Sequence, residues 1–355
     1  MTFWTIRQTV NKMKYFEAHP VTFYKDKNGR TPEILFVDGN RAAGKTTAFS
    51  RMFVDDFLKH KEKFLLVYRY ANELTNIAES FFKDIKGLFF PDHEMTDRAR
   101  ANGAYIELFL DGDSCGYAVA LNTAGKLKHY SHIFSDVEKM LFDEYQLENG
   151  AYLVNEIQKF ISLHMTVARG RGKVVRFVPV YMLSNSVSIF NPYYDAFEIA
   201  DKINSKTKQL RGDGFVLLRL TLKEVAAAQE ESAFNRAFAG ASYLKSATDN
   251  SFLNDENYNI EKTSVNGWVP LFCFRYTGEL FCCYSKEGRL HVKRGGDPAA
   301  VACYGVTQKD RDGNYSFIRS SGYYNRLCWY YQDGNITFAD VRSKAAFIKL
   351  LFDHS

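Results

Sequence analysis

The sequence predicts an α/β fold in which helices cover both faces of a mainly parallel sheet, a three-layer sandwich. Two observations lead to this prediction. Short apolar runs alternate with segments of helical periodicity over residues 34–220, and such alternation is typical of sheets built from strand–helix–strand units. One of these runs also leads directly into a glycine-containing loop and a helix start. Parallel sheets bind ligands at the carboxyl ends of their strands, which is where this loop falls.

The strand–loop–helix unit carries the strongest functional signal. An apolar run at 34–37 precedes a segment that fits the phosphate-binding pattern GxxxxGK[ST], and apolar residues at helical spacing follow it. In such a unit, backbone N–H groups cradle phosphates in front of a helix N-terminus. The lysine reaches the β/γ-phosphates and the threonine hydroxyl joins the Mg²⁺ shell. We therefore expect a nucleoside triphosphate to be bound by Gly39, Asn40, Arg41, Ala42, Ala43, Gly44, Lys45, Thr46 and Thr47.

The remaining elements of this region follow from the same periodicities. A helical start and a short strand at 21–24 precede the loop unit. Two runs of alternating apolar and polar residues, separated by an Asp-Gly-Asp turn, indicate a β-hairpin. After the loop helix we expect a strand at 64–68, a helix through 72–85, hairpin strands at 105–109 and 117–121, a loop with basic residues at 126–129, a strand ending at 143, a helix at 151–166, and strands at 174–183 and 215–220.

An acidic pair, Asp143-Glu144, ends one of these apolar strands. Together with the glycine loop, this is the signature of a Walker B strand. The aspartate holds Mg²⁺, and the glutamate polarises the attacking water as a general base. Because a glutamate next to the aspartate suits hydrolysis at a water, it argues against a P-loop kinase that transfers phosphate to an alcohol.

Other polar residues near strand ends have two interpretations each. Asn185 is either a turn former or a residue that senses the γ-phosphate. Arg169 and Arg171, in the segment ARGRGK, form either a solvated turn or an arginine finger that reaches a neighbouring subunit's site. Arg41 could supply the same charge within its own subunit. Arg69, at the end of a strand, could contact nucleotide, couple to a neighbour or do neither.

Four blocks in order, VDGNRAAGKTT, YRYANEL, LNTAGKLKHYSHIFSDVEKMLFDEY and SNSVSIFNPYY, resemble the ATPase domain of phi29-like bacteriophage DNA-packaging motors. The resemblance spans about residues 30–200. It implies an additional-strand (ASCE) P-loop ATPase fold related to the terminase and FtsK/HerA translocases, with ATP and Mg²⁺ as cofactors. It also implies a homo-oligomeric ring, expected to be a pentamer, on the portal (connector) of a prohead. That ring drives double-stranded DNA inward, and a packaging RNA is a further candidate partner.

The resemblance also assigns roles to residues. It makes Lys45 and Thr46 the phosphate and Mg²⁺ ligands, Asp143 the second Mg²⁺ ligand and Glu144 the catalytic base. It places Asn185 in a coupling motif and makes Arg171 or Arg169 the finger that acts in trans. The family's segment before Walker B faces the central channel, so Lys126 and Lys128 become candidate DNA contacts; otherwise they are solvated turn lysines. Lysine–phosphate contacts ignore base sequence and are strongly salt-dependent.

The composition changes after residue 221, so we expect an ATPase domain at 1–221, a helical or irregular linker at 222–267 and an α+β domain at 268–355 that closes on a helix at 341–352. Larger terminases carry an RNase H-like nuclease in this position, with clustered acidic residues that hold two metals. The strand around 271–276 has no Asp, and the later Asp residues fall in Gly-rich turns. We therefore expect a vestigial, inactive nuclease-like domain. The alternative is a terminase with a working nuclease.

The composition sets outer limits on location and partners. The chain has 355 residues, is 46% hydrophobic and carries a formal net charge of +5. Its six cysteines include no CxxC pair and no zinc-ligand spacing, which favours reduced thiols in a reducing compartment. No apolar run is long enough for a membrane span, and no signal peptide is recognisable. The expected location is the host cytoplasm and, transiently, the prohead portal vertex.

Overall fold

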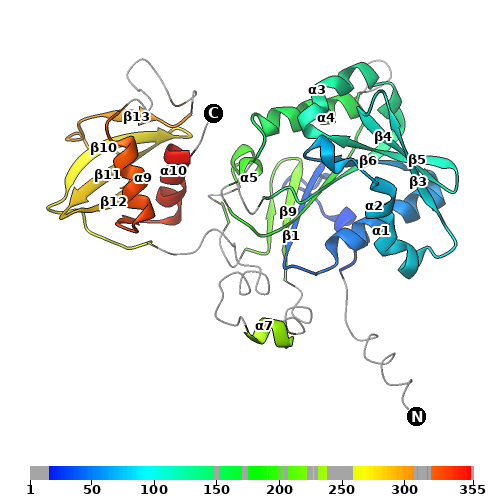
Figure 1. Cartoon of the computed structure of the whole chain (residues 1–355), viewed down its shortest axis with the longest axis horizontal. Helices are drawn as coiled ribbons and strands as arrows, with labels where there is room; N and C mark the ends of the chain where they lie inside the picture. The colour runs from blue at the N-terminus through cyan, green and yellow to red at the C-terminus, as the bar shows by residue number, and fades with distance from the viewer. Residues whose placement is uncertain are drawn as a thin grey trace, which may run out of the picture. The chain divides into compact units, whose positions relative to one another are not determined.

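A computed structural model describes residues 16–147, 152–169, 175–189, 191–199, 202–203, 207–221, 227, 231–237, 259–307, 310, 318 and 321–352. The chain divides into two compact units, Met1–Asn254 and Asp255–Ser355 (Figure 1). Of the segment expected to be a linker, the described part includes one short helix, α7 (Ala233–Ala237). The N-terminal helical start lies outside the described residues.

Among the described residues of the first unit, nine strands form one sheet in the order β3-β4-β5-β2-β6-β7-β1-β9-β8. The six strands from β5 to β9 in this order pair in parallel, whereas β3, β4 and β8 join by antiparallel pairing. The strands are β1 (Ile34–Gly39), β2 (Lys63–Tyr68), β3 (Met95–Arg100), β4 (Tyr105–Leu110), β5 (Asp113–Ala120), β6 (Val137–Asp143), β7 (Val180–Asn185), β8 (Gln209–Arg211) and β9 (Phe215–Leu220).

Helices cover both faces of this sheet (Figure 1). On one face, α1 (Lys45–His60) and α2 (Ile77–Phe89) pack against the sheet through one apolar cluster. On the other face, a second cluster joins the sheet to α3 (Ala124–Leu127), α4 (Glu156–Val167) and α5 (Pro192–Ala196). The central parallel strands are largely apolar on both faces because both faces are buried, as expected for a parallel sheet. The predicted three-layer α/β sandwich is confirmed.

The position of β7 determines where the functional residues meet. β7 lies between β1, which leads into the glycine loop, and β6, which ends at the acidic pair. Gly39 is in register with Asn185, and Asp143 with Leu183. The ends of three adjacent parallel strands therefore lie at the same edge of the sheet.

Several element predictions differ from the structure. The strand expected at 21–24 is wrong: His19–Phe23 forms a 3-10 helix, η2, with Pro20 in its first turn, a position that suits the fixed φ of proline. The loop expected at 126–129 is helical, formed by α3 and η5 (Lys128–Tyr130). The helix expected from residue 72 is a 3-10 turn, η3 (Ala71–Glu73), followed by α2.

The strand expected at 174–183 is shorter, because β7 begins at Val180. Edge strand β3 was not anticipated, since MTDRAR is polar and partly exposed. The described part of this unit also contains the 3-10 helices η4 (Leu121–Thr123) and η6 (Ile133–Asp136).

The second unit is an α+β arrangement. Its described strands form a sheet in the order β13-β10-β11-β12-β14, and α9 and α10 pack on one face of it. The closing helix is confirmed at its predicted bounds, whereas α9 was not anticipated. The bounds are β10 (Val269–Tyr276), β11 (Glu279–Lys286), β12 (Arg289–Arg294), β13 (Cys303–Gly305), β14 (Ile336–Phe338), α9 (Tyr324–Gln332) and α10 (Val341–Phe352). Among the described residues of the chain, no helix combines the length and apolar character that crossing a bilayer requires.

Candidate functional site

The loop between β1 and α1 passes twice through the left-handed region of backbone conformation. Ala42 has φ 57°, and Gly44, which precedes α1, has φ 76°. Glycine adopts this region without a steric penalty, whereas alanine is strained by roughly 1–2 kcal/mol. No side chain caps the N-terminus of α1. The first N–H groups of the helix therefore face the loop, an arrangement suited to anions.

Lys45 turns back beneath this loop. Its Nζ donates to the carbonyl oxygens of Gly39 at 3.1 Å and Asn40 at 3.0 Å, and to Oδ1 of Asn185 at 3.3 Å. A Cβ atom at position 39 would lie 3.3 Å from this amino group and 3.0 Å from the Leu220 carbonyl oxygen. Glycine at position 39 therefore leaves the space that the lysine occupies.

The charge of Lys45 is sensitive to its surroundings. Burial lowers its pKa to about 8, while the carboxylates of Asp38 and Asp143 oppose this shift and Arg41 adds to it. The ammonium group is therefore poorly hydrated, and a phosphate placed beside it would stabilise its charged form.

The acidic strand brings oxygen atoms to the start of α1. Oδ2 of Asp143 accepts a hydrogen bond from the Thr46 hydroxyl at 2.6 Å. Burial raises the pKa of Asp143, against the hydrogen bonds from Thr46 and from the backbone of Glu144. Carboxylate and hydroxyl oxygens are the ligands that Mg²⁺ prefers, usually with phosphate oxygens and water. Thr46 and Asp143 thus fit a Mg²⁺ ion bound together with a triphosphate on the loop.

Glu144 has an exposed side chain and a backbone held in the left-handed region, with φ 54°. Its N–H donates to Oδ1 of Asp143 at 2.9 Å, and its carbonyl oxygen accepts from Nη1 of Arg69 at 3.2 Å. These contacts on both sides hold a conformation that is costly for a residue with a side chain. The carboxylate is left facing solvent, where it can reach a water molecule.

Arg69 is buried behind the acidic pair rather than in the loop. It is 4% exposed and forms a buried ion pair with Glu156, with Nη2 and Oε1 3.0 Å apart. Nη2 also donates to the carbonyl oxygen of Tyr145, and Tyr193 donates its hydroxyl to Glu156. The contacts of Arg69 described here support the backbone at Glu144 and Tyr145.

The other predicted residues are distributed more widely. Arg41 is exposed on the loop, Thr47 is half-buried in the first turn of α1, and Arg169 is exposed just beyond α4. Lys126 and Lys128 are exposed on α3 and η5. Arg171 lies outside the described residues.

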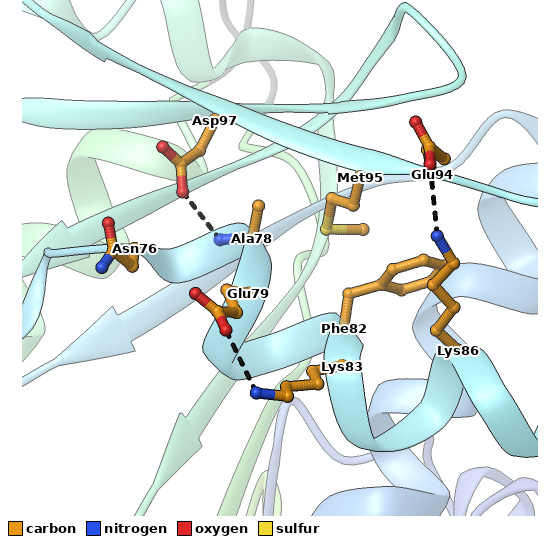
Figure 2. A pocket seen from close by; sticks show the side chains of 9 residues that line it. All are labelled: Asn76, Ala78, Glu79, Phe82, Lys83, Lys86, Glu94, Met95 and Asp97. Carbon is orange, nitrogen blue, oxygen red and sulfur yellow. Dashed lines mark hydrogen bonds and ion pairs between the residues drawn. The ribbon is translucent and has the colours of Figure 1, made fainter.

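A pocket of about 440 Å³ between α2 and β3 is separate from these residues. Figure 2 shows that its charged side chains pair with one another, Lys83 with Glu79 and Lys86 with Glu94. Asp97 accepts the Ala78 N–H at the start of α2. No residue of the loop or acidic pair lines this pocket.

Sequence reasoning missed a buried polar cluster next to the loop. Asp38 precedes Gly39 and is fully buried, and it accepts hydrogen bonds from Tyr145, Gln146 and Tyr194. A carboxylate inside the apolar run ILFVDG was the available signal, because such a group is buried only with partners.

In this sheet β7 is inserted between β1, which leads into the glycine loop, and β6, which ends at the acidic pair. This strand order defines the additional-strand class of P-loop ATPase folds. The sequence profile described as podovirus DNA encapsidation protein (Gp16) matches residues 23–351. The chain belongs to this family.

Similar proteins include the DNA packaging proteins of Bacillus phages PZA and phi29. Each is 27% identical over 310 residues, which cover 85% of this chain and 88% of the relative. A solved structure described as the bacteriophage Phi-29 viral genome packaging motor assembly matches with a TM-score of 0.62 and 24% identity, covering 95% of this chain and 99% of that one. The Phi-28 gp11 DNA packaging motor matches with a TM-score of 0.59 and 16% identity, covering 97% and 100%. Both structures share this chain's fold.

Proposed function

We propose that this protein is an ATP-driven motor that moves double-stranded DNA through a portal into a viral prohead. The observation that carries the proposal is the 2.6 Å hydrogen bond from Thr46 to Asp143, beside a buried lysine and an exposed glutamate. Membership of a DNA encapsidation family and likeness to DNA packaging proteins support the choice of DNA as the cargo.

Each site residue has a defined task in this proposal. Lys45 and the N–H groups of the loop bind the phosphates, and Thr46 and Asp143 hold Mg²⁺. When bound, Mg²⁺ supplies positive charge that neutralises phosphate oxygens. Glu144 orients a water molecule and accepts its proton. Asn185, already within hydrogen-bond distance of the Lys45 ammonium, senses whether the end phosphate is present.

The proposed motor is a ring of copies of this chain, with five subunits expected. Ile161 and Met165 stand one helical turn apart on α4 and are 51% and 68% exposed. These two side chains present apolar surface on one face of α4, which a neighbouring subunit would bury. Arg169 lies exposed just beyond this helix. We place the subunit contact here, so that Arg169 or Arg171 reaches a neighbour's nucleotide.

The DNA contacts belong to α3 and η5. Lys126 and Lys128 project from these short helices into solvent, and lysines there would follow the phosphate backbone without reading bases. The second unit is proposed to be an inactive nuclease-like domain, since β10 (VPLFCFRY) carries no carboxylate. It would contact the portal or a packaging RNA, and the assembly would act in the host cytoplasm at the prohead vertex.

The decisive experiment measures the ATP hydrolysis rate of the purified chain alone, with double-stranded DNA, and with DNA and proheads. We expect hydrolysis that requires Mg²⁺ and that rises when duplex and prohead are both present. Failure to bind ATP, or a rate unaffected by both duplex and prohead, would overturn the motor function. DNA cut in the presence of Mg²⁺ or Mn²⁺ would instead identify a terminase with a working nuclease.

A further inference from the structure

Asp38 joins the loop strand to two other segments through buried hydrogen bonds. The Tyr145 hydroxyl donates to its Oδ1 at 2.7 Å, and Nε2 of Gln146 donates to its Oδ2 at 2.9 Å. The hydroxyl of Tyr194 also donates to Oδ2. Burial raises the pKa of Asp38 to about 6, although these tyrosines, Arg219 and Lys45 all oppose the shift.

Gln146 continues this chain of contacts to the segment that follows β7. Its Oε1 accepts the backbone N–H groups of Val187 and Ser188, each at 3.1 Å. Gln146 is 3% exposed and lies two residues beyond Glu144. One side chain therefore bridges the strand of the phosphate loop, the acidic segment and the segment after Asn185.

The segment after β7 is held at both ends by these two residues. Gln146 binds its first part at Val187, and Asp38 binds its last part at Tyr194. Between them, Asn191 caps α5 with its Oδ1 and donates Nδ2 to the Ser188 carbonyl oxygen at 2.9 Å. A shift of Asp38 or Gln146 relative to this segment must therefore either move the segment or break buried hydrogen bonds.

Breaking such bonds is unfavourable, because a buried polar group without a partner bears the full cost of its lost hydration. Because these hydrogen bonds are costly to break, a displacement of one of the joined segments is expected to carry the others with it.

We propose that Gln146 is a positioning residue that couples the ATP site to residues 186–194 through Asp38. The inference rests on the proposed ATPase function. It adds a set of hydrogen bonds through which nucleotide binding would change the segment that follows β7. It predicts that binding of the nucleotide changes the hydrogen bonds at Val187 and Ser188, and that loss of Gln146 separates ATP hydrolysis from its response to DNA.

The first test uses the unmodified full chain and amide hydrogen exchange at Val187 and Ser188, with and without a slowly hydrolysed ATP analogue and Mg²⁺. We expect the exchange rates of both amides to change by at least about fivefold, the range typical of coupling between sites. Unchanged exchange at both amides in a protein that binds the analogue would overturn the proposal.

The second test compares Gln146→Leu with Tyr152→Phe. Tyr152 is a matched control because its hydroxyl accepts the N–H of Leu147 at 3.1 Å, next to Gln146 but outside the bridge. For Gln146→Leu we expect ATP affinity within about twofold of wild type and DNA stimulation of hydrolysis reduced at least about fivefold. The control should keep its stimulation. Equal stimulation in both variants would contradict the coupling role.

These outcomes separate the inference from the proposed function. If wild type neither binds nor hydrolyses ATP, the function itself fails. If wild type responds to DNA and Gln146→Leu responds equally, only the coupling role fails. The exchange measurement needs no variant, so the proposal stays testable even if Gln146→Leu does not fold.

Discussion

The ammonium nitrogen of Lys45 lies 3.3 Å from the side-chain oxygen of Asn185, although 140 positions separate the two residues. The contact exists because β1 and β7 are neighbouring parallel strands in which Gly39 and Asn185 are in register. In the proposed function, this amide touches the group that would bind the end phosphates of ATP.

Replacing Glu144 with glutamine should abolish hydrolysis while ATP binding persists. The amide keeps the size of the side chain but cannot accept a proton, and loss of a general base reduces rates by about 10²–10⁴-fold. Steady-state phosphate release and binding of a fluorescent ATP analogue measure the two effects. Glu138→Gln is the control, because Glu138 lies exposed near the opposite end of β6. Turnover by Glu144→Gln near the wild-type rate would exclude its role as base.

If an arginine acts in trans, a mixture of two inactive variants should regain ATPase activity. Arg171→Ala alone should be inactive, and so should Glu144→Gln. Mixed rings should recover part of the activity, because a subunit with an intact Glu144 can receive Arg171 from a Glu144→Gln neighbour. The measurement is ATPase rate against mixing ratio, repeated with Arg169→Ala. If Arg171→Ala shows no recovery at any ratio, the finger is not at that position.

The lysines of α3 and η5 should determine part of the salt dependence of DNA binding. Each lysine–phosphate contact contributes about 0.9 to the slope of log affinity against log salt concentration. The double variant Lys126→Ala, Lys128→Ala should therefore lower the slope by about 1.8. Lys59→Ala with Lys61→Ala is the control, since these lysines are exposed at the end of α1. Equal slopes for both double variants would remove Lys126 and Lys128 from the DNA contact.

The predicted subunit contact on α4 can be tested by adding charge. Ile161→Asp with Met165→Asp should weaken assembly, because carboxylates would have to be buried in an apolar contact. Sedimentation with Mg²⁺ and an ATP analogue, with and without proheads, reports the change. Leu88→Asp adds a charge at an exposed leucine of α2, 70% exposed, and should leave assembly unchanged. Identical sedimentation of both variants would place the contact elsewhere.

Asp38 should make folding stability depend on pH. In the folded chain its pKa is about 6, whereas an unfolded aspartate titrates near 3.9. Between these values the folded state binds more protons, so stability falls as pH rises through this window. Relative to Asp38→Asn, the unfolding free energy of wild type should fall by about 2 kcal/mol between about pH 4 and about pH 7. Urea denaturation at each pH measures this difference, and a constant difference would contradict the assignment.

Local patterns predicted the elements with strong periodicity. The loop unit, β2, the β4–β5 hairpin, β6, β9 and α10 each show a clear apolar run or helical spacing, and the structure has them close to the expected bounds. The polar edge strand β3 lacks that signal. The helical turn at Lys126 exists because Ala124 and Leu127 pack against the sheet, a tertiary contact that overrides local preference.

The partners within the buried polar clusters could not be predicted from the sequence. Asp38 meets Gln146 across 108 positions and Tyr194 across 156, and Arg69 meets Glu156 across 87. No pattern within a window of one element encodes such pairs. The charge of Arg69 and its place at a strand end suggested a role at the site, but only the strand order shows that it lies behind the acidic segment.

The hydrogen-bonded pairing of β7 with both of its neighbours limits which parts of the proposed motor can move. β1 and β6 are tied to β7 by regular parallel pairing, so sliding one against another would rupture several backbone hydrogen bonds at once. If the chain is the proposed ATP-driven motor, we expect its displacements to arise in segments beyond the ends of these strands, because the paired strands resist sliding. In the proposed motor, such a sheet would keep Lys45, Asp143 and Asn185 aligned from one ATP cycle to the next.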